Sequence, residues 1–261
     1  MNYKGVYPAK RKNGQEYFRA SLTHKSKHIA LGNFDDAETA SRAYEEGNDI
    51  LSGTDISIDR YDNTMALPFD KFVVLINLRD NKIYCPNPIY IHKNYISYYI
   101  SRGMEMKFSV DDLFYYTTHR IRKRGGHLYV NDYGMQVSLG NRYGIKNYAV
   151  EGRDYRFVNG DDTDYRYENL EIINKYYGVS YVEGARKSGY RVKINYKGDL
   201  IVGYYDDAIK AAIAYNKAVD VMKRSGCKKE FPVNYIDGMN GKTYAEIYSK
   251  IRVEDYFDKR G

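Results

Sequence analysis

The chain has 261 residues and carries 41 Lys and Arg against 34 Asp and Glu, a formal net charge of +7. This length predicts two or three compact domains, and the positive charge favours a polyanionic partner. Cys85 and Cys227 are the only cysteines, so neither a disulfide framework nor a cysteine-rich zinc site is supported. No apolar segment is long enough for a signal peptide or a membrane span, and we expect a soluble protein in a reducing cytoplasm.

Two segments of the chain, residues 3–51 and 177–222, repeat the same pattern. The matching stretches are Gly5-Val6 with Gly178-Val179, Phe18-Arg19 with Tyr190-Arg191, and Gly32 through Tyr44 with Gly203 through Tyr215. The spacing shortens by one residue between successive stretches, at turn-like places where loop lengths change at little cost. This repeat predicts two copies of one structural unit.

Each copy is predicted to form three short strands followed by one helix. The apolar Phe18, Ala20 and Leu22 alternate with Arg19, Ser21 and Thr23, and Tyr190, Val192 and Ile194 alternate with Arg191, Lys193 and Asn195. A period of two is typical of an antiparallel strand with one buried face. The acidic pairs Asp35-Asp36 and Asp206-Asp207 then mark helix starts, and alanines follow at helical spacing. We expect that helix to cover one face of the sheet.

The other face of each predicted sheet is left uncovered and carries much of the basic charge. Up to residue 34 there are seven Lys and Arg but one acidic residue, Glu16, whereas the helix that follows is acidic. A basic, twisted sheet of three strands can enter the major groove of DNA. The expected DNA contacts of the first copy are Tyr7, Arg11, Lys12, Tyr17, Arg19, Ser21, Thr23, Lys25 and Lys27. Those of the second copy are Arg186, Lys187, Arg191, Lys193, Asn195 and Lys197.

These motifs resemble the apetala-two (ethylene-response-factor) DNA-binding domain. The resemblance rests on the Gly-Val pairs, the Phe-Arg-Ala and Tyr-Arg-Val stretches, and the runs LGNFDDAETASRAY and VGYYDDAIKAAIAY. It implies two domains, at residues 1–52 and 175–235, in which the sheet contacts DNA and the helix supports the sheet. The tryptophans that plant members carry on the sheet are missing, and Tyr7, Tyr17 and Tyr181 are candidates to replace them.

Residues 53–68 are polar and rich in turn-forming residues, and we expect a linker there. The apolar run FVVLINL and the stretch KIYCP, separated by Arg-Asp-Asn, predict a β-hairpin. A helix is expected around residues 109–124, ending in a basic run. Arg122, Lys123 and Arg124 in that run are candidate phosphate contacts, with a solvated helix end as the simpler interpretation.

Residues 156–173 resemble the core of HNH homing endonucleases. The retained framework is Asn159-Gly160-Asp161 at a hairpin turn, Asp164 and Arg166 before a helix, and Glu168-Asn169-Leu170 within that helix. The resemblance implies a central α+β domain with a ββα-like core over residues 69–174. Phage proteins often join such a core to an apetala-two domain, so the two resemblances support each other.

The catalytic positions that this second resemblance implies are replaced. Phe157 stands in the position of the general-base histidine, Arg156 in that of a neighbouring metal ligand, and Tyr165 in that of the asparagine that orients the base, while Asn169 is retained. Phenylalanine cannot accept a proton, and an arginine repels a metal cation, so we expect no hydrolysis. Candidates for a relocated metal site are His119, His127, Asp154, Asp161, Asp162 and Asp164. A metal-dependent nicking endonuclease built on them is an alternative.

The sequence as a whole predicts an α+β protein in which two three-stranded antiparallel sheets, each backed by one helix, flank a degenerate HNH-like domain. Residues 236–261 are expected to form a terminal helix and tail. We expect a non-catalytic protein that binds double-stranded DNA, a phage-type transcription regulator derived from a homing endonuclease, in the cytoplasm of a bacterial host. No cofactor, metal or membrane partner is expected. A viral effector that binds a host protein is a third interpretation.

Overall fold

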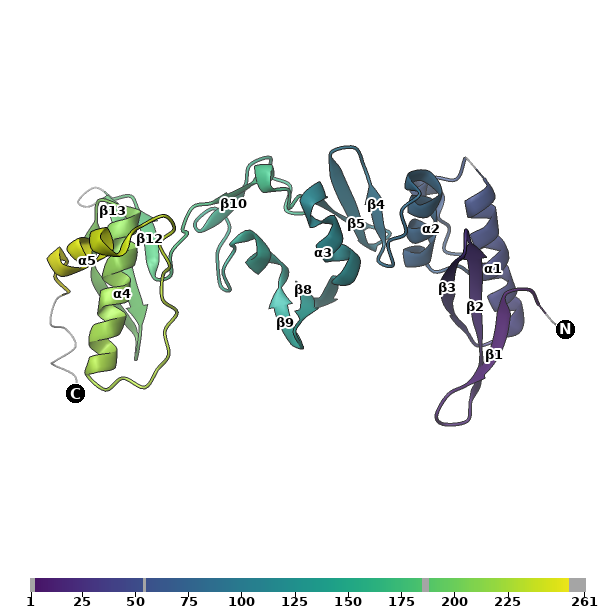
Figure 1. Ribbon diagram of the computed structural model, residues 1–261, viewed down its shortest axis with the longest axis horizontal. Coiled ribbons are helices and arrows are strands. Elements are labelled where there is room, and N and C mark those ends of the chain that lie inside the picture. Colours follow the sequence, from purple (N-terminus) through teal and green to yellow (C-terminus); the bar gives the residue numbers. More distant parts are fainter. Residues whose placement is uncertain (1–2, 54, 185–187, 254–261) are drawn as a thin grey trace. The chain divides into compact units, whose positions relative to one another are not determined.

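The structure is a computed structural model that describes residues 3–53, 55–184 and 188–253. It is an α+β protein with several small three-stranded antiparallel sheets (Figure 1). The chain divides into two compact units. One comprises the described residues up to Tyr143 together with Phe157–Leu170, and the other comprises Gly144–Arg156 and the described residues from Glu171 onward.

The N-terminal segment forms the sheet and helix that the alternation predicts. Its elements are β1 (Val6–Lys10), β2 (Glu16–His24), β3 (Lys27–Phe34) and α1 (Ala37–Ser52). The strands pair antiparallel in the order β1-β2-β3, and Ala20 and Leu22 are buried on the face that packs against α1. Asp36 caps α1, because its carboxylate accepts a hydrogen bond from the backbone N of Thr39 at 2.7 Å.

The segment that follows contradicts the predicted hairpin. The run FVVLINL lies within α2 (Phe69–Asn81), and every side chain from Phe72 to Leu78 is buried. The helix contacts α1 as well as β4 (Ile89–Ile91) and β5 (Tyr95–Ser101). A helix buried on all sides has no polar stripe, so periodicity alone cannot distinguish it from a buried strand.

The predicted linker over residues 53–68 is also wrong, because this segment packs into the core. Leu67 is fully buried, and Glu46 of α1 accepts hydrogen bonds from the backbone N of Ala66 and of Leu67 at 3.1 and 2.7 Å. One hydrophobic cluster joins the first sheet, α1, this segment and α2. Residue 69 is therefore not a domain boundary, and the predicted central domain, residues 69–174, does not coincide with either unit.

Short hairpins make up most of the remainder of this unit. The elements are β6 (Met104–Ser109), α3 (Leu113–Thr118), β7 (Arg122–Arg124), β8 (His127–Asp132) and β9 (Met135–Ser138), in the sheets β4-β5-β6 and β7-β8-β9. The basic run expected at a helix end forms β7 instead. Gly125 and Gly126 both have positive φ, so they make a two-residue turn that pairs β7 with β8.

The segment that resembles the HNH core contains the sheet of β10 (Tyr155–Phe157) and β11 (Leu170–Ile172). The predicted turn is present, since the backbone N of Gly160 donates to the carbonyl of Phe157 at 3.1 Å with a φ of +77° at Gly160. The predicted helix around Asn169 is wrong. It is a single 3-10 turn, Tyr167–Asn169, after which the chain enters β11.

The second copy lies in the other unit and repeats the first. Its elements are β12 (Val179–Val182), β13 (Gly189–Asn195), β14 (Asp199–Tyr205) and α4 (Ala208–Arg224). The strands pair antiparallel in the order β12-β13-β14, and Asp207 caps α4. The register shifts between Ala20 and Ser21 in the first copy and between the matching Val192 and Lys193 in the second.

Matching glycines strengthen the correspondence between the copies. Gly5 and Gly178 have φ values of +72° and +66°, and a Cβ on them would lie 2.1 and 2.3 Å from ring carbons of Tyr44 and Tyr215. In each copy the helix tyrosine therefore packs directly on the backbone before the first strand, which only glycine permits. The two copies thus have the same strand order, the same bulge position and the same packing of the helix on the backbone.

The C-terminal residues join the core of the second unit. The predicted terminal helix is α5 (Gly241–Lys250), which contacts α4, and Lys217 Nζ donates to the carbonyls of Tyr248 and Ile251, both at 2.7 Å. The described residues from 236 to 253 therefore pack on α4 and do not form a separate tail. Likewise the boundary expected between residues 174 and 175 falls inside this unit.

Candidate nucleic-acid interface

The outer face of each sheet is the face turned away from its helix. In the first copy the register places Tyr7, Arg19 and Asn33 in one row across the three strands, and Thr23 and His28 in another. All five side chains are exposed. This is the arrangement that the period of two requires once Ala20 and Leu22 face α1.

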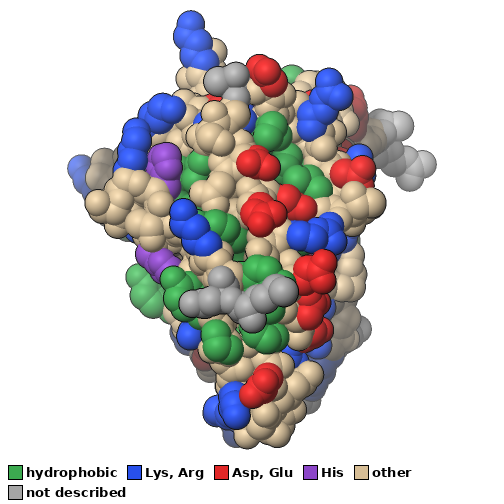
Figure 2. All heavy atoms as spheres, turned by 90° about the vertical axis from the view of Figure 1, so that its right-hand side faces the viewer, with side chains coloured by type: hydrophobic (Ala, Val, Ile, Leu, Met, Phe, Trp, Pro, Cys, Tyr) green, Lys and Arg blue, Asp and Glu red, His purple; other side chains and the backbone are tan. Residues whose placement is uncertain are grey.

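The helix on the opposite side is acidic, as the sequence indicates. Its exposed charged positions include Glu38, Arg42, Glu45 and Asp49. Figure 2 views the molecule from the side on which α1 lies and shows acidic side chains grouped toward the middle of that view. Within this copy the basic residues are therefore concentrated on the strands and turns.

Not every residue predicted to contact DNA in the first copy is equally available. Ser21 is 8% exposed, whereas Lys12 and Lys25 are exposed in the two hairpin turns. Arg11 pairs with Asp35 at 3.3 Å and lies beside the half-buried ring of Tyr17. Lys27 lies over the ring of Tyr84, 4.8 Å from its centroid.

The outer face of the second sheet carries the equivalent row Ser180, Arg191 and Tyr204. Two of the predicted contacts there are already engaged. Asp199 accepts hydrogen bonds from Lys193 Nζ at 2.8 Å and from Asn195 Nδ2 at 3.1 Å, and these bonds hold the pKa of the Asp199 carboxyl below its usual value. Lys193 and Asn195 are therefore not the free groove-facing side chains that the alternation predicts.

The structure also bears on the other DNA contacts predicted for the second copy. Tyr181 pairs with Tyr190, and their rings make an edge contact at 5.3 Å. It shares the helix-facing side of β12 with Val179, so it cannot replace a tryptophan on the outer face. Lys197 is exposed in the turn after β13, 5.5 Å from the ring centroid of Tyr196. Arg186 and Lys187 lie outside the described residues.

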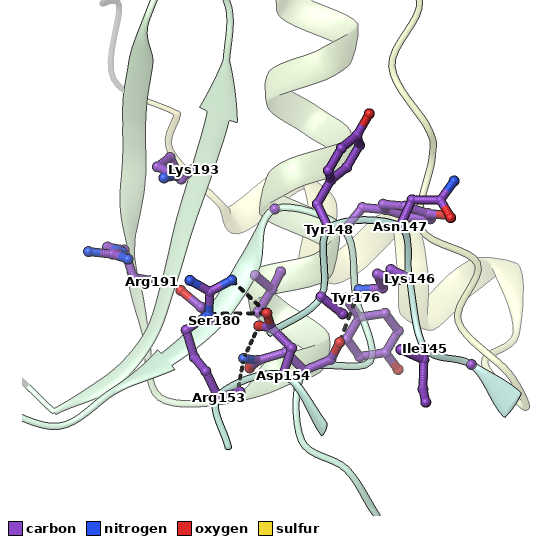
Figure 3. Close-up of a pocket in the computed structure, with 16 residues that line it drawn as sticks. Ile145, Lys146, Asn147, Tyr148, Arg153, Asp154, Tyr176, Ser180, Arg191 and Lys193 are labelled. Carbon is purple, nitrogen blue, oxygen red and sulfur yellow. Dashed lines mark hydrogen bonds and ion pairs between the residues drawn. The ribbon is translucent and has the colours of Figure 1, made fainter. Parts of the chain in front are cut away.

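Each outer face is hollowed at the repeat arginine. In the first copy the hollow is lined by Tyr7, Arg19, Ala20, Ser21, His28, Ala30, Gly32 and Asn33 together with Lys71 of α2. In the second copy Ser180, Arg191 and Lys193 line the hollow together with residues of the segment 144–154, Lys146 among them (Figure 3). Both hollows thus combine the equivalent arginine with a lysine from outside the repeat. No pattern in the sequence singles out Lys71 or Lys146.

The two repeat arginines differ from the arginines of the chain that are ion-paired. Arg79, Arg142 and Arg166 are examples that form ion pairs with carboxylates at 2.6 Å. Among the residues that the structure describes, neither Arg19 nor Arg191 forms an ion pair with a carboxylate, although the charge of Arg191 acts on the Asp199 carboxyl, and the Nε of Arg191 is buried without a hydrogen bond. Two guanidinium groups at matching positions are therefore available to an external acceptor.

The basic run of the first unit is also exposed. Arg122, Lys123 and Arg124 all lie on the surface of β7, and Lys123 Nζ contacts Met104 Sδ at 3.8 Å. In a strand, Arg122 and Arg124 point to one side and Lys123 to the other. The run therefore does not present its three charges to one partner as a helix end could.

The positions that resemble nuclease residues have structural roles. Phe157 is 6% exposed and packs edge-on against Tyr165 at 5.4 Å. Arg156 pairs with Glu171 at 2.6 Å. The Asn169 amide donates to the carbonyl of Asp164 at 2.8 Å and accepts a hydrogen bond from the backbone N of Asn159 at 2.8 Å.

The carboxylates near these positions are engaged by cations. Asp164 is buried and bonds to Arg166 at 2.6 Å, and although burial alone raises its pKa, the hydrogen bonds from Arg166 and Asn159 hold the pKa below its usual value. Asp161 accepts from Thr163 Oγ1 at 2.6 Å and lies 3.4 Å from Lys107 Nζ. Within the described ranges, no group of three or more His, Cys, Asp or Glu side chains is arranged to hold a metal ion.

No protein-family model, no curated protein and no solved structure matches the chain. No helix in the described part of the chain is long and apolar enough to cross a membrane.

Proposed function

We propose that this chain is a non-catalytic protein that binds double-stranded DNA through the outer faces of its two sheets, a phage-type regulator derived from a homing endonuclease. The observation that carries the proposal is the matched pair Arg19 and Arg191. They occupy equivalent positions on the central strands, and neither has a carboxylate partner among the described residues.

An arginine in this setting is suited to nucleic acid. Its guanidinium presents five donors in a planar fork, which matches the paired acceptors of guanine in the major groove and the oxygens of a phosphate. The neighbouring Lys71 and Lys146 add positive charge to each hollow, which favours a polyanion over a neutral partner. Tyr7 and Asn33 beside Arg19 add side chains that can bond to bases or phosphates.

Two such sheets in one chain make binding bivalent. Once one sheet is bound, the second site is held at a high effective concentration, so two weak contacts combine into a strong one. The proposed target is therefore a long or divided DNA site. This also explains how a chain of modest net charge, +7, could bind DNA with useful affinity.

The non-catalytic part of the proposal is supported by the aromatic packing of Phe157 and Tyr165 and by the ion pair of Asp164 with Arg166. A plasmid incubated with the protein and Mg²⁺ or Mn²⁺ should stay supercoiled. The variant Phe157→His should also leave it intact, because Tyr165 and Arg156 remain in place. Nicking by the wild type that disappears in Asp161→Asn or Asp164→Asn would contradict the proposal and favour a relocated metal site.

The binding proposal is tested by fluorescence anisotropy of the full chain with a labelled duplex. Affinity should fall steeply as salt rises from about 50 to 200 mM, because each neutralised phosphate releases counterions and adds about one unit to the slope of log affinity against log salt. A folded protein that binds no duplex at the lowest salt would contradict the proposal and favour a protein partner.

A further inference from the structure

A third three-stranded sheet, formed by β7, β8 and β9, lies in the first unit and outside the repeat. One of its faces packs on the core, because Val130 is buried and Leu128 and Val137 pack against the same hydrophobic cluster. Tyr116 of α3 lines a hollow together with Val130 and Val137, so α3 lies on this side of the sheet (Figure 1). Alternation along the strands therefore turns every second residue to the opposite, outer face.

The strand register shows which side chains share this outer face. Directly opposed residues of neighbouring strands point to the same side of a sheet, and so do alternate residues of one strand. Arg122 pairs with Tyr129, and Tyr129 pairs with Ser138, which makes one row across the three strands. By the same rule the face also includes Arg124, His127, Asn131 and Gln136. All of these side chains are exposed except that of Tyr129, which is half-buried.

The outer face of this sheet has positive charge and no acidic residue. Asp132 is the one acidic residue of the three strands, and alternation places it on the side that packs on the core. Arg122 and Arg124 form no ion pair with a carboxylate of the described residues, although the charge of Arg122 acts on the buried hydroxyl of Tyr98. Lys123, which lies between the two arginines, points to the other side. An anionic partner on the outer face therefore meets two cations and no opposing charge.

The row across this sheet has the same kinds of side chain as the rows of the two repeat copies. Each row combines an arginine, a tyrosine and a short polar side chain, although their order across the strands differs. The rows are Tyr7, Arg19 and Asn33; Ser180, Arg191 and Tyr204; and Arg122, Tyr129 and Ser138. The third sheet is not another copy of the repeat, because a 3-10 helix and not an α-helix follows its last strand. Only the surface chemistry is shared.

We propose that the outer face of β7, β8 and β9 is a third surface that binds duplex DNA. Its strands lie about 4.8 Å apart and span roughly 10 Å, which fits a major groove about 12 Å wide. Asn131 and Gln136 have the amide groups that pair with adenine, and the two arginines match guanine or a phosphate. Protein interfaces have an apolar centre, whereas this face has only the half-buried ring of Tyr129. The choice of DNA over another polyanion rests on the proposed function.

The first experiment removes one charge at a time from the two sides of β7 in the full chain. Arg122→Gln and Arg124→Gln change the outer face, and Lys123→Gln, on the same strand, changes the other side. In anisotropy titrations with a labelled duplex, each arginine variant should bind about fivefold or more weakly and lower the salt slope by about one unit. Lys123→Gln should bind like the wild type. No loss in either arginine variant, or an equal loss in all three, would overturn the third surface.

A second pair of variants adds one negative charge to either side of β9. Gln136 and Met135 are neighbours and both are exposed, but alternation turns Gln136 to the outer face and Met135 to the other. Gln136→Glu should therefore weaken duplex binding about threefold or more, whereas Met135→Glu should leave it unchanged. Circular dichroism checks that each variant is folded. Equal binding by the two variants would mean that DNA does not approach this face.

The same titrations distinguish the third surface from the proposed function. Weaker binding by the β7 arginine variants as well as by Arg19→Ala and Arg191→Ala is the expected result. A loss in Arg19→Ala and Arg191→Ala alone would overturn the third surface and keep the function. A loss in the β7 variants alone would keep the third surface and refute binding through the two repeat sheets. Absence of duplex binding by the folded wild type would refute both.

Discussion

The outer faces of the two sheets have the same backbone plan but different side-chain chemistry. Both have the central arginine and the bulge at matching positions. The turn end of the first face has Thr23 opposite His28, and the same end of the second has Asn195 opposite Asp199. In the second copy Asp199 binds the neighbouring Lys193 and Asn195, whereas the matching positions of the first copy hold His28, Ser21 and Thr23.

The two copies therefore agree in the direction in which equivalent side chains point. They differ in whether those side chains are free to bind a partner. Alternation along β13 places Lys193 and Asn195 on the outer face, and they are there. Their ion pair and hydrogen bond with Asp199 depend on a residue of the next strand, which a strand-by-strand pattern cannot include.

The largest expected effect is on stability, at the glycines that the two copies share. Gly5→Ala and Gly178→Ala should each lower the free energy of unfolding by about 2–4 kcal/mol, because the new Cβ meets a tyrosine ring and the positive φ is strained. Gly241→Ala, which has open space at the start of α5, is the control and should be nearly neutral. Urea unfolding followed by circular dichroism measures all three. A large loss at one repeat glycine and none at the other would break the equivalence of the copies.

Exchanging the differing residues should alter DNA binding in opposite directions. Asp199→His frees Lys193 and Asn195 and removes a negative charge from the second face, so duplex affinity should rise about three- to tenfold. His28→Asp should weaken binding by a similar factor. Anisotropy titrations of both variants at several salt concentrations provide the measurement. Equal effects of the same sign would mean that these ends of the sheets do not approach DNA.

The smallest effect concerns the pH dependence of stability at Lys146. The charged groups around it in the hollow are Arg153, Asp154, Arg191 and Lys193, with Tyr177 beside it. Its folded-state pKa of about 8 lies below the ordinary 10.5, so the protonated lysine destabilises the fold below pH 8, and the penalty fades as pH rises from 8 to 10.5.

Lys146→Met should therefore be more stable than the wild type at pH 7, by on the order of 1 kcal/mol after allowing for solvent screening. The difference should shrink toward pH 10. Denaturant titrations of the two proteins across this range, without phosphate, measure it. A difference that stays constant with pH would show that burial does not lower the pKa of Lys146.

Much of the sheet architecture could be predicted from the sequence, because alternation, turn residues and helix caps are local signals. The strands around Arg19 and Arg191, and the caps at Asp36 and Asp207, are where those signals placed them. The fully buried α2 has no amphipathic pattern, so its sequence predicts strands instead of a helix. The repeat alignment alone argues against Tyr181 as a replacement for an outer-face tryptophan, because Tyr181 aligns with Pro8 and not with Tyr7.

The candidate site was harder to predict than the fold. Lys71 and Lys146 reach the outer faces from segments distant in sequence or outside the repeat, and no local pattern marks such an approach. The resemblance to the HNH core predicts that Phe157 and Tyr165 occupy catalytic positions, but their aromatic packing is visible only in three dimensions. The sequence identifies the side-chain types at these positions, whereas their ion-pair and packing partners come from distant parts of the chain.

The most direct test of DNA recognition by the sheets is the affinity of Arg19→Ala and Arg191→Ala for a selected duplex and a scrambled one, titrated against salt. Arg19→Ala should cost about 1–3 kcal/mol on the selected duplex and reduce the preference for it, because this arginine faces the groove. Arg191→Ala should weaken both duplexes alike and lower the salt slope by about one unit. Lys210→Ala, on α4 and paired with Asp206, is the control and should change little. Unchanged binding by both arginine variants, with the proteins still folded, would contradict the account.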